Sequence, residues 1–347
     1  MSAEQQLVDR RSLLAGALAL ALTTATGCQT RSERVQLVEI LVEGDSFRPA
    51  VELKPGSSVS VSWTDLDSGK VIGKGTRPVL DTSSTQRVGL TAKAEDRSAL
   101  DQITTLNFGF DHRDDAGRFN IGPTYDHPPQ PVVGIANLQA LTQLRRFCAA
   151  GTRMAGNLDL SGLTELEHVE CFHASIQSVY LAGCSRLVRL CLERCRVSRL
   201  DLNPVRENLK DLRVAVQQTQ GAGLVFAPLA SPLSALYHYC VRDQPVHDMI
   251  PHSQLPVIEE YWVWGSQQRR CDAPISPHLR SFRANANAYD QSSVDAVLAS
   301  QWARRDGRPG AVSMAGESAI GRSEPPSSSG RAMAEDLRAR GWRITTN

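Results

Sequence analysis

The sequence repeats an apolar pair with the spacing Leu-x-x-Leu seven times between Leu144 and Phe282. The second members of successive pairs lie 22, 21, 22, 24, 25 and 21 residues apart. The pairs are Leu144–Phe147, Leu166–Val169, Leu187–Leu190, Leu209–Leu212, Leu233–Leu236, Ile258–Tyr261 and Leu279–Phe282. A turn of ~20–29 residues cannot bury its own apolar face, so stacked turns must share one core. The period therefore predicts a solenoid with an extended concave surface, which favours binding over catalysis.

The N-terminus has the three parts of an export signal. A basic pair at Arg10 and Arg11 precedes an apolar run that ends near Leu22, and small residues lead to Cys28. The apolar run of roughly 13 residues is too short to span a bilayer, which needs ~20. We therefore expect residues 1–27 to be an export signal peptide.

The same residues carry a resemblance to known signals. Arg10-Arg11-x-Leu13-Leu14 resembles a twin-arginine signal, and Ala25-Thr26-Gly27-Cys28 resembles a bacterial lipobox. The resemblance implies lipid attachment at Cys28, a lipidated tether over 28–34 and a membrane held through the lipid. Gln29 after the cysteine implies the outer membrane if the host is Gram-negative. The alternatives are general export, a non-lipidated signal peptide or an N-terminal anchor.

Charge and composition set further bounds on the partners. The chain has 38 basic and 37 acidic side chains, so it lacks the basic footprint of a nucleic-acid-binding protein. A hydrophobic content of 41% with 22% charged residues is typical of a globular chain. No segment after the export signal is apolar enough to span a membrane.

Seven cysteines follow Cys28, and all of them fall inside the repeat region. An exported protein can form disulfides, but an odd number leaves at least one thiol unpaired. Cys191 and Cys195 have no second pair of ligands that would complete a zinc site. We expect most of these cysteines to pack in the core as small hydrophobes, with one or two disulfides as the alternative. No metal or cofactor is expected.

Residues 35–110 change to a period of two, which indicates half-buried strands. Val59, Val61 and Trp63 alternate with serines, and Lys54-Pro55-Gly56 supplies a turn. The stretch 61–65, followed by 88–91, is similar to the PKD-type domains of surface proteins. The resemblance implies an immunoglobulin-like β-sandwich.

Residues 111–134 are rich in Asp, His, Pro and Gly, as in a linker or an N-terminal cap of the solenoid. The carboxylates between Asp111 and Asp115 could bind calcium, but the EF-hand order is absent. A solvated acidic turn is the favoured interpretation.

The segment from Val169 to Leu202 iterates Leu-x-Leu-x-x-(Asn/Cys)-x-Leu. This resembles the 21–22-residue leucine-rich repeats of internalin-like bacterial surface proteins, which implies a solenoid of parallel β-strands over 135–290. At the position where that family places asparagine, the chain has Thr152, Ala174, Cys195, Gln217, Val241, Ser266 and Asn287. Residues 291–347 are expected to form a C-terminal cap, with a helix over Arg331–Arg340 and a closing strand. The predicted fold class is β-rich (α+β).

A candidate binding face follows from the alternation of side chains in each strand. The concave positions are predicted to be Cys148, Glu170, Cys191, Arg213, Tyr237, Trp262 and Arg283. Tyr, Trp and Arg dominate binding hot spots, so the ligand-binding candidates are Arg213, Tyr237, Trp262, Trp264 and Arg283. The alternative is that Tyr261–Trp264 only covers irregular turns.

The chain contains no recognisable catalytic motif. Gly316–Ile320 misses the last glycine of G-x-S-x-G, and neither a phosphate-binding loop nor H-E-x-x-H occurs. We expect a non-enzymatic lipoprotein that recognises a protein or glycan ligand at the cell envelope. The alternatives are a self-associating structural component of an envelope or phage tail, and an envelope hydrolase with an unrecognised site.

Overall fold

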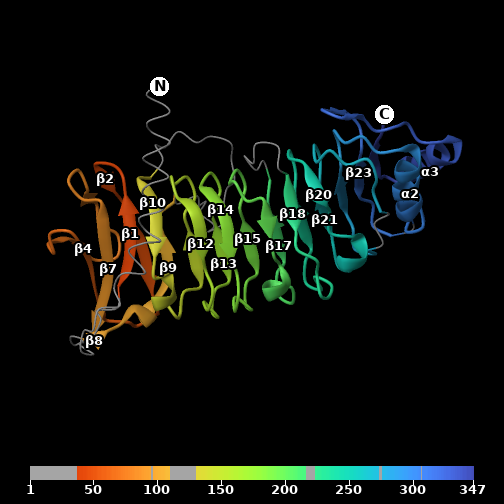
Figure 1. Cartoon of the computed structure of the whole chain (residues 1–347). Helices are drawn as coiled ribbons and strands as arrows, with labels where there is room; N and C mark the ends of the chain where they lie inside the picture. Colours follow the sequence, from red (N-terminus) through yellow and green to blue (C-terminus); the bar gives the residue numbers. More distant parts are fainter. Residues whose placement is uncertain (1–36, 95–96, 110–129, 216–222, 273–275, 306) are drawn as a thin grey trace, which may run out of the picture. The chain divides into compact units, whose positions relative to one another are not determined.

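The computed structural model describes residues 37–94, 97–109, 130–215, 223–272, 276–305 and 307–347. The described chain is β-rich, as predicted, with two α-helices and strands arranged in six sheets (Figure 1). The export signal, Cys28, Asp111–Asp115 and Gln217 lie outside the described residues. Among the described residues, no helix has both the length and the hydropathy that a membrane crossing requires.

The largest sheet has 11 strands and is parallel from β9 to β26, whereas β3 joins its other end antiparallel to β9 (Figure 1). In spatial order the strands are β26 (Arg343–Thr345), β23 (Ala311–Ser313), β22 (Ser281–Arg283), β21 (Glu260–Trp262), β19 (His238–Cys240), β17 (Asp211–Arg213), β15 (Arg189–Cys191), β13 (His168–Glu170), β11 (Arg146–Cys148), β9 (Ile103–Asn107) and β3 (Ala50–Leu53). The apolar period of the sequence therefore appears as one short strand per turn.

The central residue of each three-residue strand faces the core, and these residues are in register from strand to strand. They are Phe147, Val169, Leu190, Leu212, Tyr239, Tyr261, Phe282, Val312 and Ile344, and all are buried. Their burial in a common cluster places the core on this side of the sheet. In β19, β21 and β22 the inward residues are aromatic: Tyr239 stacks on Tyr261 at 5.2 Å, and Tyr261 on Phe282 at 5.5 Å.

The structure corrects the predicted frame in one turn. Tyr239, and not Leu236, pairs with Leu212 in the ladder, so the spacing there is 27 residues and the next is 22. Leu233 and Leu236 are both fully buried as well. Because the sequence offers Leu-x-x-Leu at 233–236 and Leu-x-x-Tyr at 236–239, spacing alone could not choose between the two frames.

Strands of two smaller sheets line the other side of the core. One parallel pair is formed by β12 (Ala155–Asp159) and β14 (Ser175–Tyr180). Further along, β16 (Arg199–Leu200), β18 (Leu224–Phe226) and β20 (Val246–Asp248) form a parallel sheet of three strands. Short 3-10 turns at Leu138–Ala140, Asn203–Val205 and His252–Gln254 connect strands within the turns.

Buried polar side chains bond the backbone of the turns at the position predicted for asparagine. Asn287 donates from Nδ2 to the carbonyls of Val263 (2.8 Å) and Ala284 (3.0 Å). Equivalent bonds are donated by Thr152 to Ala149, Cys195 to Cys171 and Ser266 to Val241. The predicted position Val241 is wrong: Gln244 donates to the Val214 carbonyl at 2.7 Å, a shift that matches the corrected frame. These bonds satisfy carbonyls that are shielded from water.

The N-terminal strands form a second sheet in the order β10-β1-β7-β4-β5, with β8 added to β7. Its strands are β1 (Val38–Val42), β4 (Ser60–Asp65), β5 (Val71–Lys74), β7 (Arg87–Ala94), β8 (Arg97–Ser98) and β10 (Val132–Ala136). A small pair is formed by β2 (Ser46–Phe47) and β6 (Leu80–Asp81). Trp63 is fully buried and donates from Nε1 to the Gly75 carbonyl at 3.0 Å. The core continues through Phe47 and Phe108 to Phe147 of β11.

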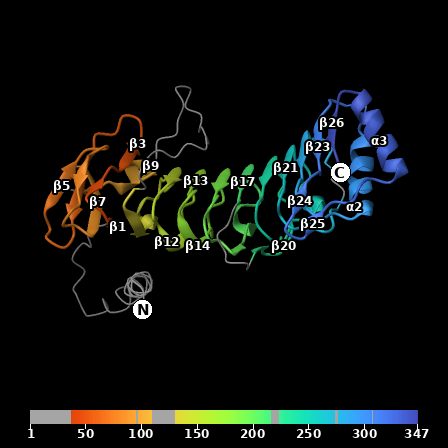
Figure 2. The same cartoon turned by 90° about the horizontal axis from the view of Figure 1, so that it is seen from above.

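The C-terminal part adds two helices and the last two strands of the large sheet (Figure 2). Helix α2 (Gln291–Trp302) is capped by Asp290, which accepts from the Ser293 amide at 2.8 Å. A short hairpin, β24 (Glu317–Ser318) and β25 (Gly321–Arg322), precedes helix α3 (Ser328–Ala339). Gly341 has a φ of 86° and ends α3, as expected, before β26.

Cysteines 148, 171, 184, 191, 195 and 240 are buried, and Cys271 is half-buried. None of these seven cysteines is in a disulfide in the structure. Burial explains why these positions carry cysteine, because a free thiol packs as a small hydrophobe.

Candidate functional site

The outer face of the large sheet, opposite the core, carries the first and third residues of each short strand, because side chains alternate along a strand. The first positions are Arg146, His168, Arg189, Asp211, His238, Glu260, Ser281, Ala311 and Arg343. The third positions are Cys148, Glu170, Cys191, Arg213, Cys240, Trp262, Arg283, Ser313 and Thr345. We refer to this surface as the outer face.

Four of the five predicted ligand-binding residues lie on or next to the outer face, whereas Tyr237 leaves the predicted ladder. Cys240 occupies the register position between Arg213 and Trp262. Tyr237 comes just before β19 and is 45% exposed. The assignment of Tyr237 to this ladder is therefore wrong, for the same reason that Leu236 was placed in the wrong frame.

Trp262 is held from three sides. Its Nε1 donates to the Ser281 hydroxyl on the neighbouring strand at 3.1 Å. The His238 ring meets it edge-on at 4.9 Å, and the Arg283 guanidinium lies over the ring, 4.6 Å from its centroid. Trp262 is only half-buried, so it is an aromatic surface with a fixed orientation.

Trp264 continues this aromatic surface at a centroid distance of 5.9 Å from Trp262. The guanidinium of Arg242 lies 4.9 Å from the Trp264 ring centroid and also pairs with Asp243 at 2.7 Å and Glu193 at 3.7 Å. Arg242 is not among the residues predicted from the sequence. The sequence signal for Arg242 is its position two residues after Cys240, because Trp264 likewise stands two residues after Trp262. This equivalence appears only in the corrected frame, where Cys240 pairs with Trp262.

An ionic cluster lies beside Trp262 on β17 and β19. Asp211 Oδ1 is 2.8 Å from His238 Nδ1 and 3.1 Å from Arg213 Nε. Burial opposes ionisation of Asp211, but the hydrogen bond with His238 and the charge of Arg213 outweigh it and hold the Asp211 pKa at about 2. Asp211 and His238 are buried, so the cluster orients Arg213 and the His238 ring behind Trp262.

The cluster extends to β15 and β13 through Arg189, whose Nε is 3.3 Å from Glu170 Oε1 and 3.5 Å from Asp211 Oδ2. Burial raises the pKa of Glu170, and the charge of Arg189 opposes this rise. Three adjacent strands therefore share alternating charges across the outer face. Such a network orients its members more than it stabilises the fold.

The thiols beside the ionic cluster are held in their protonated form. Cys191 and Cys240 adjoin the cluster in the ladder. Burial raises the pKa of both thiols, that of Cys240 to about 12, so they stay protonated at neutral pH. Among the described residues, no group of three His, Cys, Asp or Glu side chains is arranged to hold a metal ion. The other features of this face are planar cations, aromatic rings and fixed hydrogen bonds, which are the groups that predominate at recognition surfaces.

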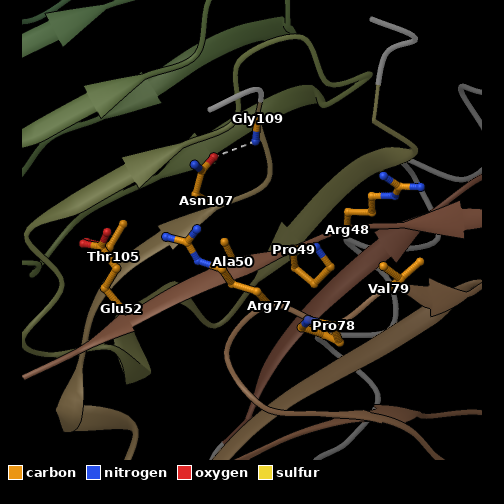
Figure 3. Close-up of a pocket in the computed structure, with 10 residues that line it drawn as sticks. All are labelled: Arg48, Pro49, Ala50, Glu52, Arg77, Pro78, Val79, Thr105, Asn107 and Gly109. Atoms are coloured by element: carbon orange, nitrogen blue, oxygen red, sulfur yellow. Dashed lines mark hydrogen bonds between the residues drawn. The ribbon is translucent and has the colours of Figure 1, made fainter. Parts of the chain in front are cut away.

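A separate hollow lies at the N-terminal end of the large sheet, beside β3 and β9 (Figure 3). Arg48 and Arg77 line it together with Glu52, which accepts from the Thr105 hydroxyl at 2.7 Å. Asn107 accepts from the Gly109 amide at 2.8 Å. None of the predicted ligand-binding residues borders this hollow.

A comparison with known protein families finds no matching family model, and a comparison with curated proteins finds no significant match.

Proposed function

We propose that this chain is an exported leucine-rich-repeat lipoprotein whose outer face recognises a protein or glycan ligand at the cell envelope. The repeat assignment is supported by one parallel three-residue strand per turn and by the polar ladder that ends at Asn287. The second proposed part, an immunoglobulin-like β-sandwich, is supported by antiparallel strands around the buried Trp63.

The observation that best supports a binding function is the fixed orientation of Trp262, which contacts Ser281, His238 and Arg283. A half-exposed indole in a fixed orientation loses little conformational freedom when a ligand covers it. Trp and Arg are also the residue types whose truncation costs most at interfaces. The surface is therefore built for recognition before any ligand arrives.

The location is proposed from the sequence signals. Lipid attachment at Cys28, after removal of 1–27, would anchor the chain to a membrane and leave the described residues to bind in the envelope. In a Gram-negative host, Gln29 favours the outer membrane.

The test is a pull-down with the mature soluble form, residues 29–347, against envelope fractions and a glycan array. We expect Trp262→Ala to reduce capture at least about tenfold, the typical effect of a hot-spot aromatic. Trp302→Ala is the matched control, because Trp302 is a 36% exposed tryptophan of α2 with Arg305 stacked over it. Undiminished capture by a folded Trp262→Ala protein would refute the proposal.

A structural role is the second candidate, because β26 and β3 are the two end strands of the large sheet in the described part of the chain. An open sheet edge can pair with another copy of the chain. Silence in both binding screens, together with concentration-dependent self-association on a sizing column, would favour this alternative.

A further inference from the structure

Charge is distributed unevenly along the outer face. Up to β19, the arginines of the ionic cluster and its neighbours have carboxylate partners: Arg189 pairs with Glu170, and Arg213 with Asp211. Arg242, which follows β19, pairs with Asp243 and Glu193. The positive charges of Arg189, Arg213 and Arg242 are thus neutralised within the protein.

Beyond Trp262 this compensation stops. The outer positions of β22, β23 and β26, which we call the basic strip, are Ser281, Arg283, Ala311, Ser313, Arg343 and Thr345. No acidic side chain occupies an outer position of these three strands. Arg283 and Arg343 are both exposed, and neither forms an ion pair with the residues that the structure describes.

Glu260 on β21 is the acidic outer residue next to the strip, opposite Ser281 in the register. Its Oε2 lies 3.8 Å from His238 Nε2, on the side away from β22. The strip therefore begins where the ionic cluster ends, with Trp262 and Arg283 at the boundary.

The contacts on the ring faces of Trp262 and Trp264 indicate which kind of ligand can bind. Sugars bind tryptophan by stacking on the ring face, but Arg283 covers a face of Trp262 and Arg242 covers a face of Trp264. A guanidinium stacked on a ring keeps its N–H edge free for planar, charge-assisted bonds to a carboxylate. The arrangement favours an acidic group over a neutral sugar ring.

We propose that the basic strip binds an acidic segment of a protein ligand, with carboxylates at Arg283 and Arg343. This inference rests on the proposed function and names the ligand chemistry of that face. With strands ~4.8 Å apart and ~3.3 Å per residue, the two arginine Cα atoms are about 12 Å apart. Carboxylates two to four residues apart in an extended peptide can reach both guanidinium groups. Ser313 is opposite Arg283 in the register, and Thr345 is opposite Ser313 on the strand of Arg343, so two hydroxyl-bearing residues adjoin the arginines.

The experiment measures binding of a fluorescent hexaglutamate peptide to residues 29–347 by anisotropy. Arg283→Ala and Arg343→Ala should each weaken binding about threefold to tenfold, and the double variant by about the product. Raising the ionic strength should weaken binding of the unmodified protein, because both arginines are exposed. Arg322→Ala on β25 is the matched control, since it removes the same charge from an exposed position outside the strip.

Each of the other possible outcomes would contradict a different part of the proposal. An equal loss in Arg322→Ala would mean non-specific charge attraction and would overturn the strip. Equally tight binding of polygalacturonate with the same arginine dependence would replace the peptide by an acidic polysaccharide. If hexaglutamate fails to bind while capture from envelope fractions still depends on Trp262, the acidic class is wrong and the proposed function stands. Capture that is independent of Trp262 removes the proposed function itself.

Discussion

Asp211 and His238 meet across neighbouring strands of the large sheet, with Oδ1 and Nδ1 2.8 Å apart. They are 27 residues apart in the sequence and are opposite each other in the register. Their contact connects the ionic cluster of the outer face to Trp262, because the same imidazole ring touches the indole at 4.9 Å. The position of the proposed binding tryptophan thus depends on a buried carboxylate two strands away.

Asp211→Asn should remove an acid-sensitive contribution to stability. The carboxylate has a pKa of about 2 in the folded protein and an ordinary value of 3.8, so its ionised form favours folding. This contribution, about 2 kcal/mol, is complete above pH 4 and is lost as the pH falls towards 2. Urea unfolding between pH 5 and pH 2.5 should show a smaller loss for Asp211→Asn than for the unmodified protein. The exposed Asp201→Asn variant should keep the original pH dependence.

His252 should make the fold less stable in mild acid. Burial lowers its pKa to about 4 from the ordinary value of 6.5, and its ring packs on Tyr261 at 4.4 Å. Between pH 6.5 and 4 the His252 ring is protonated in the unfolded chain but stays neutral in the folded chain. About 3 kcal/mol of stability is therefore lost as the pH falls through that window. His252→Phe should flatten the unfolding free energy over this range, and His278→Phe at an exposed position should not. An unchanged slope in His252→Phe would show that other groups cause the acid sensitivity.

Tyr239→Ala and Tyr237→Ala should differ sharply in stability. Tyr239 is fully buried in the aromatic ladder, so its truncation should cost about 3–5 kcal/mol. Tyr237 is 45% exposed, and its truncation should change the unfolding free energy by less than about 0.5 kcal/mol. Denaturant midpoints of the two variants measure the difference. Similar values would contradict the register in which Cys240 follows Arg213.

The repeat-region thiols should resist labelling in the native protein. Burial raises the pKa of Cys184 to about 11 and of Cys195 to about 12, so few thiolates form at pH 8. In a Cys28→Ala form, Ellman's reagent should react first with half-buried Cys271 and reach seven thiols only after denaturation. Fewer than seven in non-reducing denaturant would show that a disulfide forms.

Much of the fold could be predicted from local pattern. The β-rich class, the strands at Phe147, Val169, Leu190 and Leu212, and the stop of the last helix at Gly341 follow from apolar spacing and turn chemistry. The pattern failed between Leu212 and Tyr261. There the sequence offers overlapping apolar pairs, and only the packing of complete turns selects one of them.

The candidate site could likewise be predicted only in part from the sequence. Trp262 and Arg283 could be placed outside the core because alternation along a strand is a local property, independent of the neighbouring turn. Arg242, His238 and Asp211 were missed because their roles depend on which strand lies beside which.

The sequence by itself determined that the chain builds short strands at a repeating interval and which side chain of most strands enters the core. The apolar period and the alternation of side chains are sufficient to predict these two features, since burial of the central apolar residue stabilises the strand of each turn. Only the tertiary structure decided the register after β17, and with it the contacts of Asp211 with His238 and of Arg242 with Trp264. Those contacts depend on pairing between strands distant in sequence, which is set by the packing of the whole turn.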